Sequence, residues 1–171
     1  MERECLAALT LRRVAREAGV SQAAPYSHFK DKKALLAAVA IEGFERFDKL
    51  MKEYAAKEET YIIGLGMGYI QFALAHPALF HLMFNNDLVE LIEICSEDIA
   101  YNSSYETLVA AVNKTPLLQF GESHPQLDTA FLWSLVHGLA NLLLAERIHP
   151  TAYGFADNEI FLRQLLEKYL R

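Results

Sequence analysis

Residues 10–22 read TLRRVAREAGVSQ, and this stretch decides the fold of the N-terminal part of the chain. Thr10 can cap a helix by accepting a hydrogen bond from a free backbone N–H. The apolar residues that follow share one helical face, and Gly19 can adopt the positive φ that ends a helix sharply. Val20 is expected to point inward, and Ser21 is expected to cap a second helix. The stretch therefore predicts a helix-turn-helix, a motif whose second helix enters the major groove of DNA.

Charge is divided unevenly along the 171 residues of the chain, whose formal net charge is −6. Residues 1–40 carry seven Lys and Arg against four Asp and Glu, whereas the remaining residues carry nine against 18. A basic N-terminal part suits a polyanionic partner such as nucleic acid, and an acidic remainder repels one. The division agrees with a nucleic-acid-binding head on an acidic body.

Composition and periodicity favour an all-α protein. Apolar residues make up 53% of the chain, enough for a sizeable core, and no stretch alternates apolar and polar residues as a strand would. Pro25 predicts an irregular first turn in the second helix. We expect a helix-turn-helix head over residues 1–40 and a helical bundle over residues 41–171. The expected helices are Leu11–Ala18, Gln22–Phe29, Lys32–Ala56, Tyr61–His76, Pro77–Met83, Leu88–Val112 (unbroken, or broken near Ser96 or Asn102–Ser104), Pro125–Ile148 and Asp157–Leu170.

The motifs of common enzyme and metal sites are missing or incomplete. The three glycines between residues 64 and 68 lack the preceding strand and wider spacing of a dinucleotide fingerprint, and predict close helix packing instead. His76 and His81 are five residues apart across a proline, which does not place two metal ligands on one helical face. Cys5 and Cys95 have no CxxC partner and fit a reduced intracellular protein. We therefore expect no catalytic residue, no metal and no cofactor.

The apolar segment Tyr61–Phe84 contains no Asp, Glu, Lys or Arg and is long enough to span a membrane. Its interior holds Gln71, His76, Pro77 and His81, and its flanks are acidic where a membrane anchor favours Lys or Arg. A helix buried inside the protein is the preferred interpretation, and a membrane-attached helical protein is the alternative. Because no secretory signal is visible, we expect a cytoplasmic protein without a membrane partner.

The run GVSQAAPYSHFKDKKALL, residues 19–36, closely resembles the TetR/AcrR family of one-component transcriptional regulators. The resemblance rests on Ala15, Gly19-Val20-Ser21, Tyr26-x-His28-Phe29 and Lys32-x-Ala34-Leu35-Leu36. Further matches in the body look like the family branch named for a Trp-His-Gly motif, and these are Tyr69, Phe72, Ala73, His76-Pro77, Met83-Phe84, Trp133 and His137-Gly138-Leu139. The resemblance covers most of the chain. It implies a dimeric regulator of transcription, most often a repressor, that responds to a small molecule.

By this resemblance, the second helix would read base pairs in an operator, and the residues around it would grip phosphates. A glutamine suits bidentate pairing with adenine, and alanine methyl groups suit contact with the thymine methyl group. Phosphate contacts fix register and affinity but carry little sequence information. The candidates for base contact are Gln22, Ala23, Ala24 and Ser27, and the candidates for phosphate contact are Thr10, Arg12, Tyr26, His28 and Lys32.

The resemblance also implies a small-molecule cavity among the central helices and a homodimer formed by the last two long helices. Two-fold pairing would place two recognition helices about one DNA turn apart, roughly 34 Å. Aromatic and Met side chains line adaptable, mostly apolar pockets, although such a residue at helical spacing more often belongs to the ordinary core. For an unknown apolar or amphipathic effector, the candidate lining residues are Tyr69, Phe72, His76, Phe80, Met83, Phe84, Trp133 and His137.

One departure from the family pattern concerns the N-terminus. Family members have a full helix before the helix-turn-helix, whereas only Met1–Leu9 precede Thr10 here. We therefore expect the first helix to be missing, an apolar face of the head to be partly uncovered, and DNA binding to be weak or absent. The alternative function is a helical small-molecule-binding or interaction protein that has lost DNA recognition.

Overall fold

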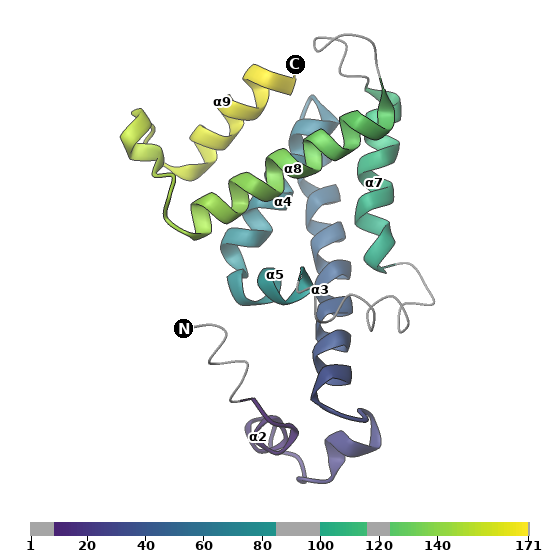
Figure 1. The fold of residues 1–171 in the computed structure, drawn as a ribbon. Coiled ribbons are helices and arrows are strands. Elements are labelled where there is room, and N and C mark those ends of the chain that lie inside the picture. The colour runs from purple at the N-terminus through teal and green to yellow at the C-terminus, as the bar shows by residue number, and fades with distance from the viewer. Residues whose placement is uncertain (1–8, 85–99, 116–123, 171) are drawn as a thin grey trace.

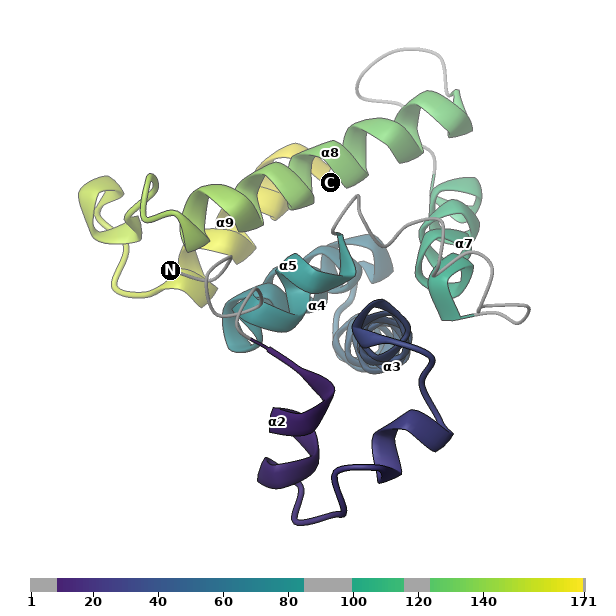
Figure 2. The ribbon, with the colours of Figure 1, turned by 60° about the horizontal axis from the view of Figure 1, so that its bottom comes forward.

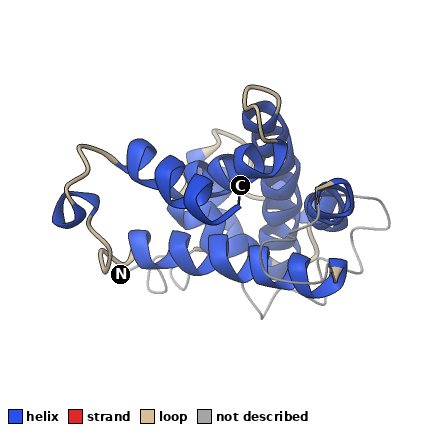
Figure 3. Cartoon of the chain, turned by 90° about the horizontal axis from the view of Figure 1, so that it is seen from above, coloured by secondary structure: helices blue, strands red, loops and turns tan. Residues whose placement is uncertain are grey.

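The computed structural model describes residues 9–84, 100–115 and 124–170, and this part of the chain consists of helices and loops without a strand (Figures 1 and 3). The all-α prediction is therefore confirmed. The predicted lack of a first helix concerns residues 1–8, which lie outside the described residues. In chain order the elements are α2 (Leu11–Glu17), the 3-10 helix η1 (Ala24–Ser27), α3 (Lys32–Ala55), α4 (Tyr61–Ala75), α5 (Pro77–Met83), α7 (Ala100–Lys114), α8 (Pro125–Leu144), the 3-10 helix η4 (Pro150–Tyr153) and α9 (Asn158–Leu170).

α2 and η1 form a small head at one end of the long helix α3, and the remaining helices make up the body (Figures 1 and 2). Thr10 caps α2 as predicted, because its Oγ accepts a hydrogen bond from the N–H of Arg13 at 3.2 Å. Gly19 has a φ of 69°, so the chain turns sharply after α2 as predicted. Asp31 caps α3 by accepting a hydrogen bond from the N–H of Ala34 at 2.9 Å. The caps and the glycine fix the ends of the two helices that flank the turn.

The second helix of the motif is shorter than the sequence predicts. A helix is expected over Gln22–Phe29, whereas the structure has the single 3-10 turn Ala24–Ser27. Pro25 is the physical reason, because its nitrogen has no hydrogen to donate to the carbonyl four residues before it. The turn closes instead through the tighter bond from the N–H of Tyr26 to the carbonyl of Ala23. The irregularity predicted at Pro25 is confirmed, and the predicted length is wrong.

Two side chains of the turn also differ from the prediction. Val20 is 49% exposed instead of pointing inward, because the single turn of η1 is too short to close over it. Ser21 does not cap η1 with its side chain; the residue at the cap position is Ala23, and the carbonyl of Ser21 accepts from the N–H of Ala24. The head is packed around Ala15, which is completely buried where α2 meets η1.

α4 is the central helix of the body and contacts α3, α5, α7, α8 and α9. Every residue of α4 from Ile62 to Ile70 is buried. The apolar segment Tyr61–Phe84 contains the two predicted helices, α4 and α5, which meet at a bend of 111°. Among the described helices, α8 is by itself long and apolar enough to cross a membrane, a test that core helices of soluble proteins also pass.

α4 approaches α3 closely because two of its residues lack a side chain. A Cβ atom on Gly64 would lie 2.4 Å from the Cα of Ala55, and a Cβ atom on Gly68 would lie 2.7 Å from the Cα of Met51. Both distances are far shorter than the van der Waals separation of two carbon atoms. The prediction of close helix packing is therefore confirmed at Gly64 and Gly68.

The later helices have different limits from the predicted ones. α8 ends at Leu144 instead of Ile148, because Glu146 has a φ of 52° and the N–H of Arg147 bonds back to the carbonyl of Leu142 at 2.8 Å. α7 begins at Ala100, so the earlier part of the predicted helix Leu88–Val112 lies outside the described residues.

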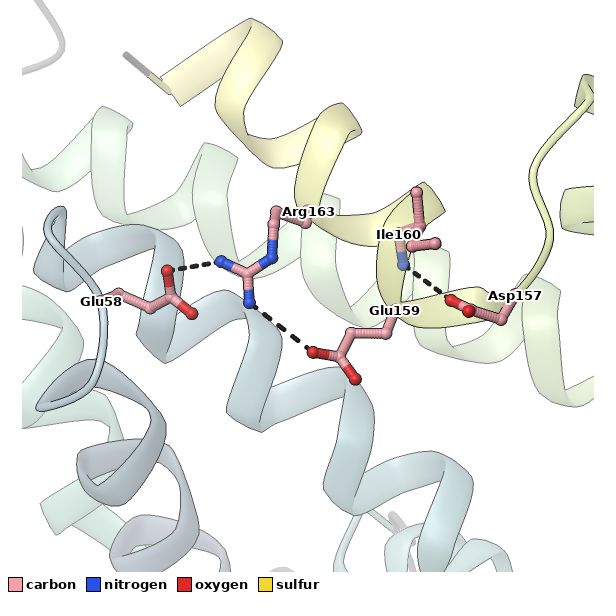
Figure 4. Close-up of polar contacts among 5 residues, drawn as sticks. All are labelled: Glu58, Asp157, Glu159, Ile160 and Arg163. Atoms are coloured by element: carbon pink, nitrogen blue, oxygen red, sulfur yellow. Dashed lines mark hydrogen bonds and ion pairs between the residues drawn. The ribbon is translucent and has the colours of Figure 1, made fainter.

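An ion pair ties α9 to the loop between α3 and α4 (Figure 4). Nη1 of Arg163 donates a hydrogen bond to Oε2 of Glu58 at 2.6 Å, and Nη2 lies 3.7 Å from Oε1 of Glu159. Asp157 caps α9 by accepting from the N–H of Ile160 at 2.9 Å. The bond from Arg163 is the main reason why the pKa of Glu58 is below its ordinary value.

We expect Glu58→Gln to destabilise the protein by up to about 1 kcal/mol at neutral pH, because a partly exposed ion pair contributes no more than this. Since folding lowers the pKa of Glu58, its contribution is complete above the ordinary carboxyl pKa and is lost as the pH falls through the lower, folded-state value. Urea unfolding of both proteins at pH 7 and at decreasing pH measures the difference. Glu159→Gln, which removes the longer and more exposed contact, is the control and should have little effect. A difference that grows as the pH falls would contradict this account.

Candidate functional site

The residues predicted to contact DNA lie on the outer surface of the head. Seven of the nine are exposed, and the two that are half-buried are Ala24 and Lys32. The Oγ of Ser27 donates to the carbonyl of Ala24 at 2.7 Å, so this hydroxyl partly stabilises η1. The exposed residues are Thr10, Arg12, Gln22, Ala23, Tyr26, Ser27 and His28. The predicted residues therefore lie together on the surface formed by α2, η1 and the start of α3. Their contacts with DNA remain a prediction.

The head carries further basic side chains that are not among the residues predicted to contact DNA. Arg13 and Arg16 are exposed on α2, and Lys30 and Lys33 are exposed at the start of α3. Nη2 of Arg16 lies 3.6 Å from Oε1 of the neighbouring Glu17. The basic surface thus extends on both sides of η1, as phosphate contacts to a duplex require.

The body encloses a cavity of about 550 Å³ between α3, α4, α5, α7, α8 and α9. Its wall is mostly apolar, with six aromatic side chains and the thioether of two Met residues. The lining residues are Phe44, Phe47, Met51, Ile62, Leu65, Gly66, Tyr69, Met83, Phe84, Ser104, Tyr105, Leu108, Leu132, Trp133, Ser134, Val136, His137 and Leu170. A cavity of this size and composition can bind one small organic molecule.

Three polar side chains on the wall are joined to one another. The hydroxyl of Tyr69 on α4 lies 2.8 Å from Nδ1 of His137 on α8. The indole N–H of Trp133 also bonds to Tyr69. Burial raises the pKa of Tyr69 and lowers the pKa of His137, the latter with help from nearby His81. Both groups are therefore uncharged at neutral pH, and Tyr69 links α4 to two residues of α8 that are four apart.

Five of the eight predicted lining residues lie on the cavity wall, namely Tyr69, Met83, Phe84, Trp133 and His137. The other three do not. Phe72 is buried against Phe47, with ring centroids 5.1 Å apart, because it faces α3. Phe80 lies behind the wall, packed against Phe84 and His137 at 4.9 and 5.5 Å. His76 is exposed at the junction of α4 and α5, where it precedes Pro77.

The prediction missed the contributions of α3 and α7 to the wall. Phe44, Phe47 and Met51 follow a three-and-four spacing on α3, which places them on one helical face. That spacing was visible in the sequence and indicates a buried face without distinguishing core from cavity. Tyr105 and Leu108 come from α7, whose contact with α8 no local pattern reveals.

Among the described residues, no group of three or more His, Cys, Asp and Glu is placed to hold a metal ion. The polar groups of the cavity are suited to hydrogen bonding with a neutral molecule. The head is suited to contact with a polyanion. The two sites lie at opposite parts of α3, the helix that they share.

Comparison with known proteins agrees with this arrangement. Residues 2–39 match the family of bacterial regulatory proteins known as the tetR family, and residues 62–169 match a tetracyclin repressor-like C-terminal domain. A structure described as that of a protein with unknown function from Rhodococcus sp. RHA1 is similar, with a TM-score of 0.73 and 26% identity, covering 95% of this chain and 84% of that chain. No functionally curated protein matched the chain. With one family model on the head and a second on most of the body, the chain belongs to the TetR family of ligand-responsive transcriptional regulators.

Proposed function

We propose that this TetR-family regulator acts in the cytoplasm as a homodimeric repressor that binds an operator through its head and releases it when an effector fills the cavity. Residues 1–40 serve as the DNA-binding part, and residues 41–171 serve as the effector-binding and dimerisation part. The matches to Trp133 and His137-Gly138 suggest the branch named for the Trp-His-Gly motif. The observation that carries the proposal is the single helix α3, which belongs to both parts.

α3 connects the two sites without a break. It starts at the Asp31 cap in the head and continues to Ala55 in the body. Phe44, Phe47 and Met51 on this helix line the cavity. A ligand that pushes on these side chains moves the helix on which the head is mounted. An effector shifts the equilibrium between two positions of α3 only if it binds one of these positions more tightly than the other. An effector in this cavity contacts α3 directly, and this contact supplies the difference in affinity.

The exposed face of α8 supports dimerisation through the last two long helices. Leu127, Phe131 and Leu142 are 64%, 45% and 44% exposed and follow one side of α8. Between them lies Gly138, where an added Cβ would meet nothing within 4 Å. A glycine inside a helix costs about 1 kcal/mol relative to alanine, and no packing contact with the described residues requires one here. Close approach of a second copy to Gly138 accounts for both features.

Selection of DNA from a random-sequence library by the purified chain tests the proposal. We expect a palindromic sequence to be enriched at low salt, where weak binding of the kind predicted from the sequence is still detectable, because a two-fold dimer presents two heads. Binding to it should weaken steeply between low and physiological salt, since phosphate contacts release counterions. DNA flanking the protein's own gene is the second probe. Failure to enrich any sequence at low salt would overturn operator binding and favour the helical ligand-binding alternative.

We expect Arg12→Gln to weaken operator binding at all sequences alike and to reduce the slope of log affinity against log salt by about 1 for each head. Arg12 is exposed next to the Thr10 cap, so its loss leaves the fold of α2 intact. Fluorescence anisotropy with labelled operator at several salt concentrations measures both effects. Arg46→Gln is the matched control, because Arg46 is also exposed but lies on α3 in an ion pair with Glu42 at 2.8 Å. An unchanged slope for Arg12→Gln would remove Arg12 from the phosphate contacts.

A further inference from the structure

The charge of the cavity wall restricts the effector. Among the described residues that line the cavity, none is Asp, Glu, Lys or Arg. Of these described residues, His137 alone can carry a positive charge near neutral pH, and burial lowers its pKa. A charged group that leaves water without a countercharge pays a desolvation cost of several kcal/mol. The described wall therefore favours an uncharged ligand.

The wall carries the hydroxyls of Ser104, Tyr105 and Ser134, and it also carries one donor whose orientation is fixed by a second wall residue, the imidazole of His137. We assign the hydroxyl of Tyr69 as the donor to Nδ1 of His137, because a phenol is a stronger acid than the N–H of a neutral imidazole. With this assignment the hydrogen of the neutral imidazole is on Nε2. Within the described residues, no protein acceptor bonds to this second nitrogen, and no fully buried side-chain nitrogen or oxygen is without a partner. Nε2 is therefore accessible from the cavity that His137 lines. A ligand that offers one acceptor, such as a hydroxyl or carbonyl oxygen, fits this donor.

Volume and shape restrict the ligand further. The cavity of about 550 Å³ is roughly three to four times the 150 Å³ cavity that holds one benzene molecule. Two or three rings, or an alkyl chain of similar volume, fill it. Tyr105 and Trp133 both line the cavity and are 47% and 40% exposed, with ring centroids 5.7 Å apart, so the cavity opens to solvent beside this pair.

We propose that the cavity binds an uncharged, mostly apolar molecule with a hydrogen-bond acceptor that is seated on Nε2 of His137. The inference rests on the proposed function, in which this cavity is the effector site. It adds the chemical class of the effector and the residue that orients it. The Tyr69–His137 bond fixes the imidazole tautomer that donates, so Tyr69 is a positioning residue for the same contact.

Trp133 provides the readout, because it is the single tryptophan of the chain and lines the cavity. Titration of the full chain at pH 8 with 1-decanol, decanoate and decylammonium, each below its micelle concentration, compares three head groups on one alkyl chain. We expect decanol to change the fluorescence of Trp133 with an affinity at least about 100-fold higher than either ion. If decanoate or decylammonium bound as tightly as decanol or more tightly, the inference that the ligand is uncharged would be wrong, whereas the cavity would still be an effector site. No binding of any probe would overturn the effector site itself.

Two substitutions of His137 test whether this residue anchors the ligand through a hydrogen bond. His137→Leu removes the donor and should weaken decanol about tenfold, whereas His137→Gln keeps an N–H donor and should retain affinity within about threefold. Tyr54→Phe is the control, because Tyr54 is half-buried outside the cavity wall and its hydroxyl should not matter. Far-UV circular dichroism checks that each variant is folded. Equal decanol affinity in the native and His137→Leu proteins would remove His137 as the anchor.

Discussion

Replacement of Gly64 by alanine is expected to destabilise the protein by about 3 kcal/mol or more. The added methyl group would lie 2.4 Å from the Cα of Ala55 and 2.9 Å from the carbonyl oxygen of Tyr54. Both obstacles are backbone atoms, so α4 must move away from α3 as a unit. For a chain of this length the midpoint of thermal unfolding should fall by about 10 °C. Thermal and urea unfolding followed by circular dichroism measure the change.

Gly66 on the same helix provides the matched control. A methyl group there would lie 3.1 Å from Cδ1 of Leu166, the end of a side chain that can adjust. Alanine also favours the helix by about 1 kcal/mol relative to glycine, which offsets the crowding. Gly66→Ala should therefore change stability by less than about 1 kcal/mol. Equal losses for Gly64→Ala and Gly66→Ala would show that the close contact of α4 with α3 is not the cause.

Replacement of Phe131 by glutamate is expected to convert the dimer to a monomer and to weaken operator binding at least about 100-fold. The substitution places a charge in the apolar face of α8 that the proposed dimer buries, and a second copy places the same charge opposite it. Loss of the dimer also lowers the operator affinity, because two linked heads bind one palindrome far more tightly than separate heads do. Sedimentation velocity gives the oligomeric state, and anisotropy with the selected DNA gives the affinity.

Tyr61→Glu is the control for surface charge. Tyr61 is 44% exposed, close to the 45% of Phe131, but lies at the first position of α4, outside the proposed interface. Its replacement should leave both the dimer and the DNA affinity unchanged. A dimer that survives Phe131→Glu would place the interface elsewhere on the molecule, and a monomer with undiminished operator affinity would overturn the link between pairing and binding.

The sequence was most informative where a single residue determines the local geometry. The predictions are confirmed for the helix cap at Thr10, the positive φ of Gly19 and the close helix packing at the glycines of α4. Each of these features depends on the chemistry of a single residue. Prediction failed at Val20, whose exposure depends on how far the next helix extends. That length depends on Pro25, whose missing N–H leaves a single 3-10 turn in place of the longer helix.

The cavity was harder to predict, for a different physical reason. An aromatic residue at helical spacing faces inward whether it meets a neighbour or an empty space. Phe72 and Phe84 therefore look alike in the sequence, although Phe72 packs into the core and Phe84 lines the cavity. Tyr105 was overlooked because the wall it helps to build depends on contacts between distant segments. His76 is predicted from the family resemblance of His76-Pro77, but in the structure Pro77 starts α5 and His76 is not on the cavity wall.

The unbroken course of α3 has a consequence for how relatives of this protein can diverge. Each residue inserted in an α-helix advances the chain by 1.5 Å and rotates whatever follows by about 100°. One residue gained or lost between Asp31 and Phe44 would thus turn the head to a different side of the body, and two copies could no longer face one duplex together. Insertions are tolerated in the loops, but this segment has to keep its length. Exchange of heads between family members should succeed only when the junction preserves the helical phase.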